Sequence, residues 1–269
     1  MKLILAKNNC QLLNTLTNNF SVTLLILLPF TLLTGNFIPD LSIVIISLLF
    51  IIKIIWNGDF ELINKKIFFS FIVFYFIICF TSIISNNPFI SLSSSLLYIR
   101  FGIFSLAVCY LIQKNENLIK IFTIFFFATF LFALIDGYYQ FFFDESIFGF
   151  VATSPNRMVL PLNDKMYLGG YLSRLFPLLI ALLIYNFKYS RINILIASIL
   201  LITTDVLVFI TGERTALGLM LITTILFIVF LSKFKFIRFI TLAISVISII
   251  VISFSSPEIT KRNITYTLN

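Results

Sequence analysis

Residues 118–139 read LIKIFTIFFFATFLFALIDGYY, a nearly unbroken apolar stretch that holds one lysine, Lys120, and one aspartate, Asp136. About 20 apolar residues in a helix are enough to cross the hydrocarbon core of a membrane. The whole chain repeats this pattern, because 60% of its 269 residues are hydrophobic and only 11% are charged. Soluble domains carry about 25% charged residues, so this composition cannot cover a water-facing surface. The sequence therefore predicts an all-α, polytopic integral membrane protein.

Apolar segments separated by short polar breaks predict about nine spanning helices in a single transmembrane domain over residues 1–269. Their expected ranges are 20–35, 38–56, 67–85, 92–112, 118–139, 167–187, 192–211, 214–232 and 235–254. The first segment has no small-residue cleavage site after it, so we interpret it as a retained helix and not as a signal peptide. Gly35 and Pro39 separate the first two helices, and Gly212 lies in a tight turn between the seventh and eighth.

The formal net charge of +8 comes from basic residues that stand singly or in pairs between apolar segments. Nucleic-acid binding needs a dense basic stripe, which this pattern does not form. Alternate connections hold 12 of the 19 basic residues on one side and five on the other. The positive-inside rule then predicts a cytoplasmic N-terminus and, after nine spans, an external C-terminus. Lys53, near the cytoplasmic end of the second helix, is expected to extend to the membrane surface.

The connection between the fifth and sixth predicted helices, residues 140–166, is much longer than an ordinary helix connection of 2–8 residues. The predicted orientation places it outside. One interpretation is a solvated loop with a re-entrant stretch. We favour a functional role, because long ordered loops commonly carry binding or catalytic residues.

Several ionisable residues lie within or beside the predicted spans, where they are costly and therefore candidates for function. All fall in the predicted outer half of the membrane: Arg100, Asp136, Arg174, Asp205, Glu213 and Arg214. Buried ion pairs, such as Arg100 with Asp136 and Arg174 with Asp205, are one explanation. An outward cavity for phosphate is another, since the planar guanidinium group binds phosphate oxygens with two hydrogen bonds.

Two other kinds of site fit the composition poorly. A proton relay would favour chained carboxylates and histidines, and the chain has no histidine. The three cysteines form no CxxC pair, so a zinc site is not expected.

The chain resembles the O-antigen ligase and polymerase-like membrane proteins of bacterial envelopes. The resemblance covers residues of about 90–235 and rests on motifs in the family's order: YIRFG at 98–102, IDGYYQ at 135–140, Phe148-Gly149, and GGYLSRLFP at 169–177. The turn TGERT at 211–215 is similar to the family's Ser/Thr-Gly-x-Arg-Thr turn.

The resemblance implies a glycosyltransferase of the bacterial inner membrane that works on its outer face. Such an enzyme takes a glycan from undecaprenyl diphosphate and passes it to a lipid A core or another glycan acceptor. It uses neither a metal ion nor a nucleotide sugar, so no cofactor is expected. The family's diphosphate-binding arginines correspond to Arg157 and Arg214, with Arg174 as a third candidate.

The sequence departs from the family in lacking a histidine and the large periplasmic loop that bears it. Glycan transfer needs a base for the acceptor's proton, and Asp164 and Glu213 are the weak candidates present. A truncated member with reduced or no activity is therefore one expectation. A transporter or flippase of lipid-linked sugars and a non-catalytic membrane subunit are the alternatives.

Overall fold

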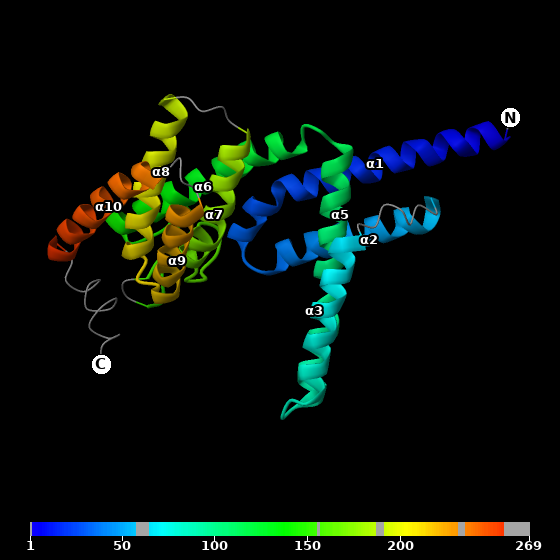
Figure 1. Ribbon diagram of the computed structural model, residues 1–269, viewed down its shortest axis with the longest axis horizontal. Coiled ribbons are helices and arrows are strands. Elements are labelled where there is room, and N and C mark those ends of the chain that lie inside the picture. The colour runs from blue at the N-terminus through cyan, green and yellow to red at the C-terminus, as the bar shows by residue number, and fades with distance from the viewer. Residues whose placement is uncertain (1, 58–64, 155–156, 187–190, 231–234, 256–269) are drawn as a thin grey trace. The chain divides into compact units, whose positions relative to one another are not determined.

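The computed structural model describes residues 2–57, 65–154, 157–186, 191–230 and 235–255 (Figure 1). Within these ranges every extended regular element is a helix. The α-helices are α1 Lys2–Thr31, α2 Phe37–Asn57, α3 Lys65–Ile83, α4 Pro88–Leu97, α5 Ile99–Lys114, α6 Leu118–Phe143, α7 Leu168–Asn186, α8 Arg191–Ile210, α9 Arg214–Phe230 and α10 Lys235–Ser255. Four basic residues that were counted for orientation, Lys188, Lys233, Lys261 and Arg262, lie outside the described residues.

The helices have the length and composition of membrane spans. Among the described residues, seven are long and apolar enough to cross a membrane, with α4 and α5 forming one span over Pro88–Lys114. Two further predicted spans form shorter apolar helices, Phe68–Ile83 and Arg214–Phe230. The protein is therefore an all-α polytopic membrane protein.

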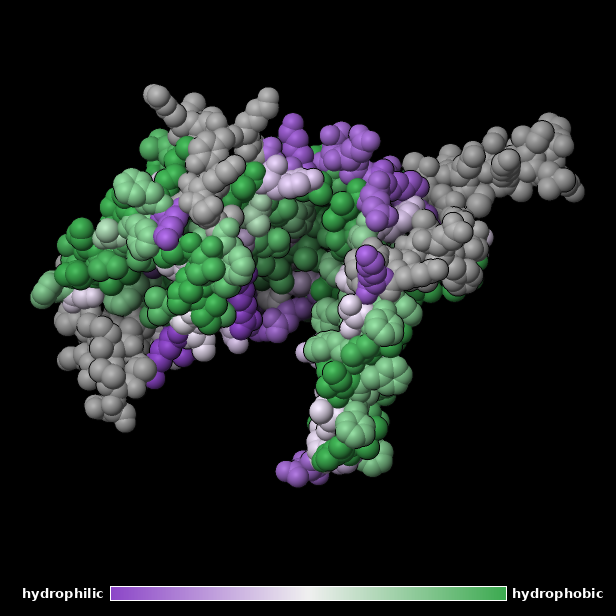
Figure 2. All heavy atoms as spheres, viewed as in Figure 1, coloured by the Kyte–Doolittle hydropathy of each residue, from purple (hydrophilic) through white to green (hydrophobic). Residues whose placement is uncertain are grey.

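Large apolar side chains cover the outside of the helices. Phe69 and Phe80 on α3 are 70% and 65% exposed, and Phe254 on α10 is 86% exposed. Figure 2 shows apolar residues along the visible surface of α3, with polar residues gathered at the end of the α3–α4 hairpin. In water this surface would drive aggregation, whereas lipid tails solvate it without cost.

The helix boundaries differ from the predicted ones where local chemistry decides them. The first helix begins at Lys2 and not at residue 20, because hydropathy detects only the apolar part of a helix. It ends in a 3-10 turn, Leu32–Thr34, followed by Gly35 at a φ of +104°, which favours glycine. The fourth predicted helix begins earlier, at Pro88, and divides at Tyr98 into α4 and α5.

The chain forms two compact units, residues 1–28 with 36–122, and residues 29–35 with 123–269. In unit 1, α2 packs against α5, and α3 packs against both α4 and α5. Its buried apolar core includes Ile46, Phe50, Leu106 and Tyr110. The rings of Phe50 and Tyr110 lie 5.8 Å apart between centroids.

Unit 2 is held by contacts of α8 with α10, of α7 with α8 and α9, and of α9 with α10. An aromatic cluster joins α6 to α7, since the ring of Phe130 lies 6.5 Å from that of Tyr171 and 6.1 Å from that of Phe176. The hydroxyl of Tyr171 also donates to the carbonyl of Pro29 at 3.0 Å. These contacts fix the N-terminal half of α7, where the candidate site lies.

Candidate functional site

The turn between α8 and α9 meets the first turn of α7 through one carboxylate. The N–H groups of Gly169 and Gly170 donate to Oε1 and Oε2 of Glu213, each at 2.9 Å. N–H groups in the first turn of a helix have no partner within the helix, and the helix dipole favours a negative charge there. Glu213 therefore caps α7 from a different element of the chain.

Glycine is required for this close approach. A Cβ atom on Gly169 would collide with the hydroxyl of Thr211 and lie 3.1 Å from the carboxyl carbon of Glu213. A Cβ atom on Gly170 would lie 3.3 Å from Oε2 of Glu213. Gly212, with a φ of +66°, allows the chain to reverse between α8 and α9. The GGYLSRLFP and TGERT motifs, which the sequence presents separately, thus form one structure.

Two of the predicted diphosphate-binding arginines lie near this cap. Burial raises the pKa of Glu213 above its ordinary value, and the two glycine N–H groups and the charges of Arg157 and Arg174 oppose that rise. Both arginine side chains are exposed, as is that of Arg214, the first residue of α9. Among the described residues, no carboxylate forms an ion pair with any of the three. This end of unit 2 therefore presents positive charge around a fixed carboxylate.

Of the two weak candidates for a catalytic base, Glu213 has both oxygens occupied by backbone N–H groups. Asp164 is exposed, in the turn Leu160–Lys165. Its neighbour Asn163 holds this turn in place, since its side-chain amide donates to the carbonyl of Thr34 at 3.1 Å. Glu213 is thus positioned for structure, whereas the carboxylate of Asp164 is open to solvent.

The long connection runs over residues 144–167, because α6 continues to Phe143. Two side chains one turn apart on α6 anchor it. Asp136, fully buried, accepts the N–H of Ile147 at 2.8 Å and the amide of Gln140 at 2.5 Å. Gln140 pairs with the backbone of Val159, accepting its N–H at 2.9 Å and donating to its carbonyl at 3.0 Å. The described part of the connection is therefore ordered, and Asp136 serves to hold it.

The ion pairs expected from the sequence are wrong in their partners. Arg100 pairs with Asp40 on α2, at 2.8 Å between Nη1 and Oδ2. Asp205 pairs with Arg238 on α10, at 2.7 Å between Oδ2 and Nη1. Depth along a helix suggested partners, but the choice of partner depends on which helices pack together.

Arg238 is one of the 12 basic residues that the charge count places on the cytoplasmic side, and the structure buries its side chain at 1% exposure. Its guanidinium group also donates to the hydroxyl of Thr224, and Ser245 donates to Asp205 at 3.1 Å. One signal could have revealed this cluster. Arg238, Thr241 and Ser245 recur at helical spacing along a segment whose other positions are almost all apolar, and all three are buried.

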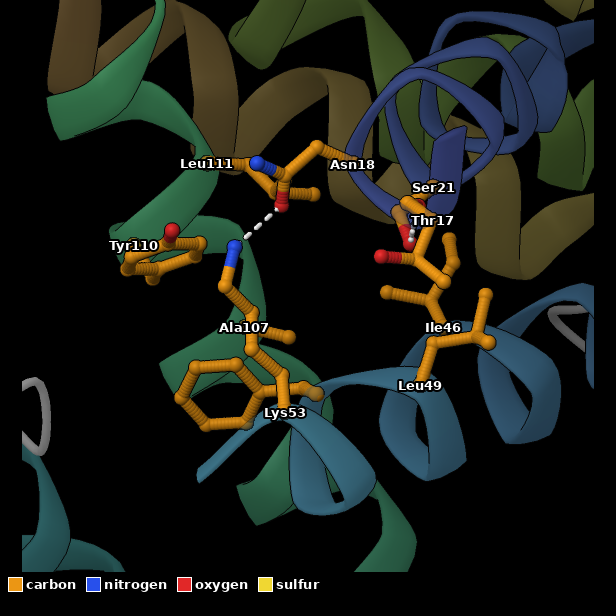
Figure 3. A pocket seen from close by; sticks show the side chains of 10 residues that line it. Thr17, Asn18, Ser21, Ile46, Leu49, Lys53, Ala107, Tyr110 and Leu111 are labelled. Carbon is orange, nitrogen blue, oxygen red and sulfur yellow. Dashed lines mark hydrogen bonds between the residues drawn. The ribbon is translucent and has the colours of Figure 1, made fainter. Parts of the chain in front are cut away.

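Lys53 also differs from the expectation that it extends to the membrane surface. Its side chain is buried at 7% exposure and donates to Oδ1 of Asn18 at 2.6 Å (Figure 3). The ammonium group depends mainly on partners in the interior, because little of the side chain is exposed.

Comparison of the chain with protein-family models, with curated proteins and with solved structures gave no match.

Proposed function

We propose that the arginine-bearing end of unit 2 binds the diphosphate of a lipid-linked glycan. On this proposal the protein is an O-antigen ligase- or polymerase-like glycosyltransferase of the bacterial inner membrane. Its donor is a glycan on undecaprenyl diphosphate, and its acceptor is a lipid A core or another glycan. The observation that supports the proposal most is the placement of Arg157 and Arg174 near Glu213, with Arg214 next to it in the chain.

The charges suit a diphosphate. Three guanidinium groups and one carboxylate leave two positive charges in excess, and a diphosphate ester carries negative charge on both phosphoryl groups. Each planar guanidinium can donate two parallel hydrogen bonds to phosphate oxygens, and it stays charged at any physiological pH. Because Glu213 is fixed by Gly169 and Gly170, it provides a rigid point near which Arg157 and Arg174 lie.

In the proposed reaction, an acceptor hydroxyl attacks the anomeric carbon of the donor glycan. The bond between that carbon and the diphosphate oxygen breaks, and the carrier diphosphate leaves with the electron pair. Arginines at the diphosphate stabilise the charge that develops on the leaving group. The hydroxyl proton needs an acceptor, and the exposed Asp164 is the candidate, since both oxygens of Glu213 already accept backbone hydrogen bonds.

A non-catalytic membrane subunit that binds the same donor is the second candidate. The engagement of Glu213 as a helix cap favours it, because the carboxylate whose pKa the charges of Arg157 and Arg174 lower then has a structural task.

The test measures donor binding and glycan transfer on the same purified protein, with undecaprenyl diphosphate-linked glycan as ligand. Arg157→Lys and Arg174→Lys are each expected to weaken donor binding about tenfold, because an ammonium group cannot make the two-pronged contact. Lys120→Arg, at an exposed residue of unit 1, is the control and should leave binding unchanged. Binding with transfer supports the enzyme, and binding without transfer supports the subunit. No donor binding, or binding that neither arginine variant changes, would refute both.

A further inference from the structure

The turn formed by residues 146–150, just after α6, folds back along that helix instead of leaving it. The N–H of Ile147 donates to Oδ1 of Asp136 at 2.8 Å, although Asp136 lies well before the end of α6. The ring centroid of Phe148 lies 6.3 Å from that of Phe132. Phe132 comes eleven residues before the end of α6, a distance of about 16 Å along the helix axis. The 146–150 turn therefore lies beside the body of α6 and not beyond its end.

This position places the turn at the depth of the hydrocarbon core of the membrane. The helix α6 has 26 residues, whereas about 20 suffice to cross the core. Any stretch of that length within α6 includes both Asp136 and Phe132. Even where the stretch begins at the first residue of α6, Phe132 lies about 8 Å below the edge of the core. A side chain in contact with Phe132 is then level with the acyl chains.

The backbone of the turn has the partners that such a place demands. An N–H group without a partner is costly in lipid, so non-helical backbone occurs at this depth only where the protein satisfies it. The N–H of Ser146 donates to the carbonyl of Phe150 at 2.9 Å, and the N–H of Phe150 donates to the hydroxyl of Ser146 at 3.0 Å. The N–H of Gly149 donates to the carbonyl of Ser146 at 2.8 Å. Together with the bond from Ile147 to the fully buried Asp136, these bonds satisfy the turn without water.

The side chains of the turn are apolar where they are exposed. Ile147 and Phe148 are 45% and 58% exposed, and Val151, directly after the turn, is 58% exposed. Two acidic residues, Asp144 and Glu145, lie between the end of α6 and the turn, and Asp144 has a φ of +62° where the chain reverses. Exposure of large apolar side chains to water is unfavourable, whereas lipid tails solvate them. The charges thus precede the turn, and the apolar side chains lie on it.

We propose that the 146–150 turn is a re-entrant segment whose Ile147 and Phe148 side chains contact lipid acyl chains. The predicted orientation of the chain assigns this contact to the outer leaflet. Asp136 makes the entry possible, because its buried carboxylate accepts a backbone N–H that water does not reach. The proposal does not depend on the glycosyltransferase activity.

Tryptophan fluorescence of the full chain in proteoliposomes measures the depth of the turn. Trp56, the single tryptophan, is first replaced by phenylalanine, and Phe148→Trp then supplies one reporter. Bromine atoms at a chosen position on the acyl chains quench a tryptophan at that depth, and acrylamide quenches a tryptophan in water. We expect Phe148→Trp to be quenched by bromine and protected from acrylamide. It should lie about 10–15 Å deeper than Phe142→Trp, because ten residues of α6 separate Phe132 from Phe142.

Two further reporters complete the test. Lys165→Trp, at an exposed charged position of the same connection, is the control and should be quenched by acrylamide and little by bromine. Ile147→Trp should behave as Phe148→Trp does, and it replaces that variant if Phe148→Trp does not fold. A reporter in the turn that is no deeper than Phe142→Trp, or that acrylamide quenches as strongly as Lys165→Trp, would overturn the proposal. Protection of the turn from both quenchers would assign this surface to a protein contact and would also overturn it.

Discussion

Arg238 and Asp205 offer a direct measure of what buried charge does in this bundle. Their side chains are 2% and 9% exposed, and two hydrogen bonds of 2.7 and 3.2 Å join them. Arg238→Met removes the cation while keeping a long side chain. Asp205 is then left as a buried carboxylate whose remaining described donor is Ser245. Breaking a buried pair in this way costs about 3–5 kcal/mol of unfolding free energy.

The double variant Asp205→Leu, Arg238→Met should behave differently. It removes both charges, and apolar replacement of a buried pair is often neutral or stabilising. Ser245 keeps a partner in the double variant, because its hydroxyl also donates to the carbonyl of Thr241 at 2.8 Å. We therefore expect the double variant to lie within about 1 kcal/mol of wild type, far closer than Arg238→Met alone.

The assay is reversible unfolding in mixed detergent micelles, followed by circular dichroism, for wild type, both single variants and the double variant. Lys235→Met is the control, because Lys235 is exposed in the same helical turn as Arg238, and its unfolding free energy should change by less than about 0.5 kcal/mol. A double variant destabilised by the sum of the two single variants would show that the two charges do not act as a pair, and the reasoning would fail.

Two further predictions concern the cap on α7. Gly169→Ala should lower the unfolding free energy by about 1–3 kcal/mol, because the added Cβ meets Thr211 and Glu213. Gly218→Ala is the control and should not lower it, since no atom lies within 4 Å of the added Cβ. Equal losses in the two variants would contradict the packing argument. Because burial raises the pKa of Glu213 above 4.5, the stability that this group contributes is present below that pH and is lost as the pH rises through the raised value. Thermal denaturation of wild type, but not of Glu213→Gln, should therefore shift to lower temperature between pH 4.5 and pH 7, and parallel pH profiles would contradict this.

The existence of the helices could be predicted from the sequence, because only helices or closed barrels satisfy backbone hydrogen bonds in lipid. Segments such as 118–139 can therefore be identified as helices from little more than their hydropathy. The polar start of α1 could not be found this way, since residues 2–15 precede the apolar span that begins at Leu16. The break at Tyr98 also lies inside a continuous apolar span, so hydropathy does not reveal it.

The site could be predicted only in part, because sequence gives depth along a helix but neither tilt nor neighbours. The resemblance indicated Arg157 and Arg174 as candidate diphosphate ligands, and the charges of both act on Glu213. Asp205 lies about 20 Å along α8 from its first residue, yet its partner Arg238 is in the first turn of α10. Upright helices of equal depth would not bring these two residues together.

The polar side chains of α10 face inwards and its apolar side chains face outwards, and this arrangement affects how the helix is inserted into the membrane. Arg238, Thr241 and Ser245 face the interior of unit 2, while Phe236, Phe254 and their apolar neighbours face outwards. An arginine that enters lipid without a partner raises the free energy of insertion. Asp205 emerges from the ribosome 33 residues before Arg238, so the counter-ion is already in the membrane when α10 arrives. Insertion of the last described helix is thus coupled to the earlier placement of α8. Loss of Asp205 should therefore impair the membrane insertion of α10 during biogenesis.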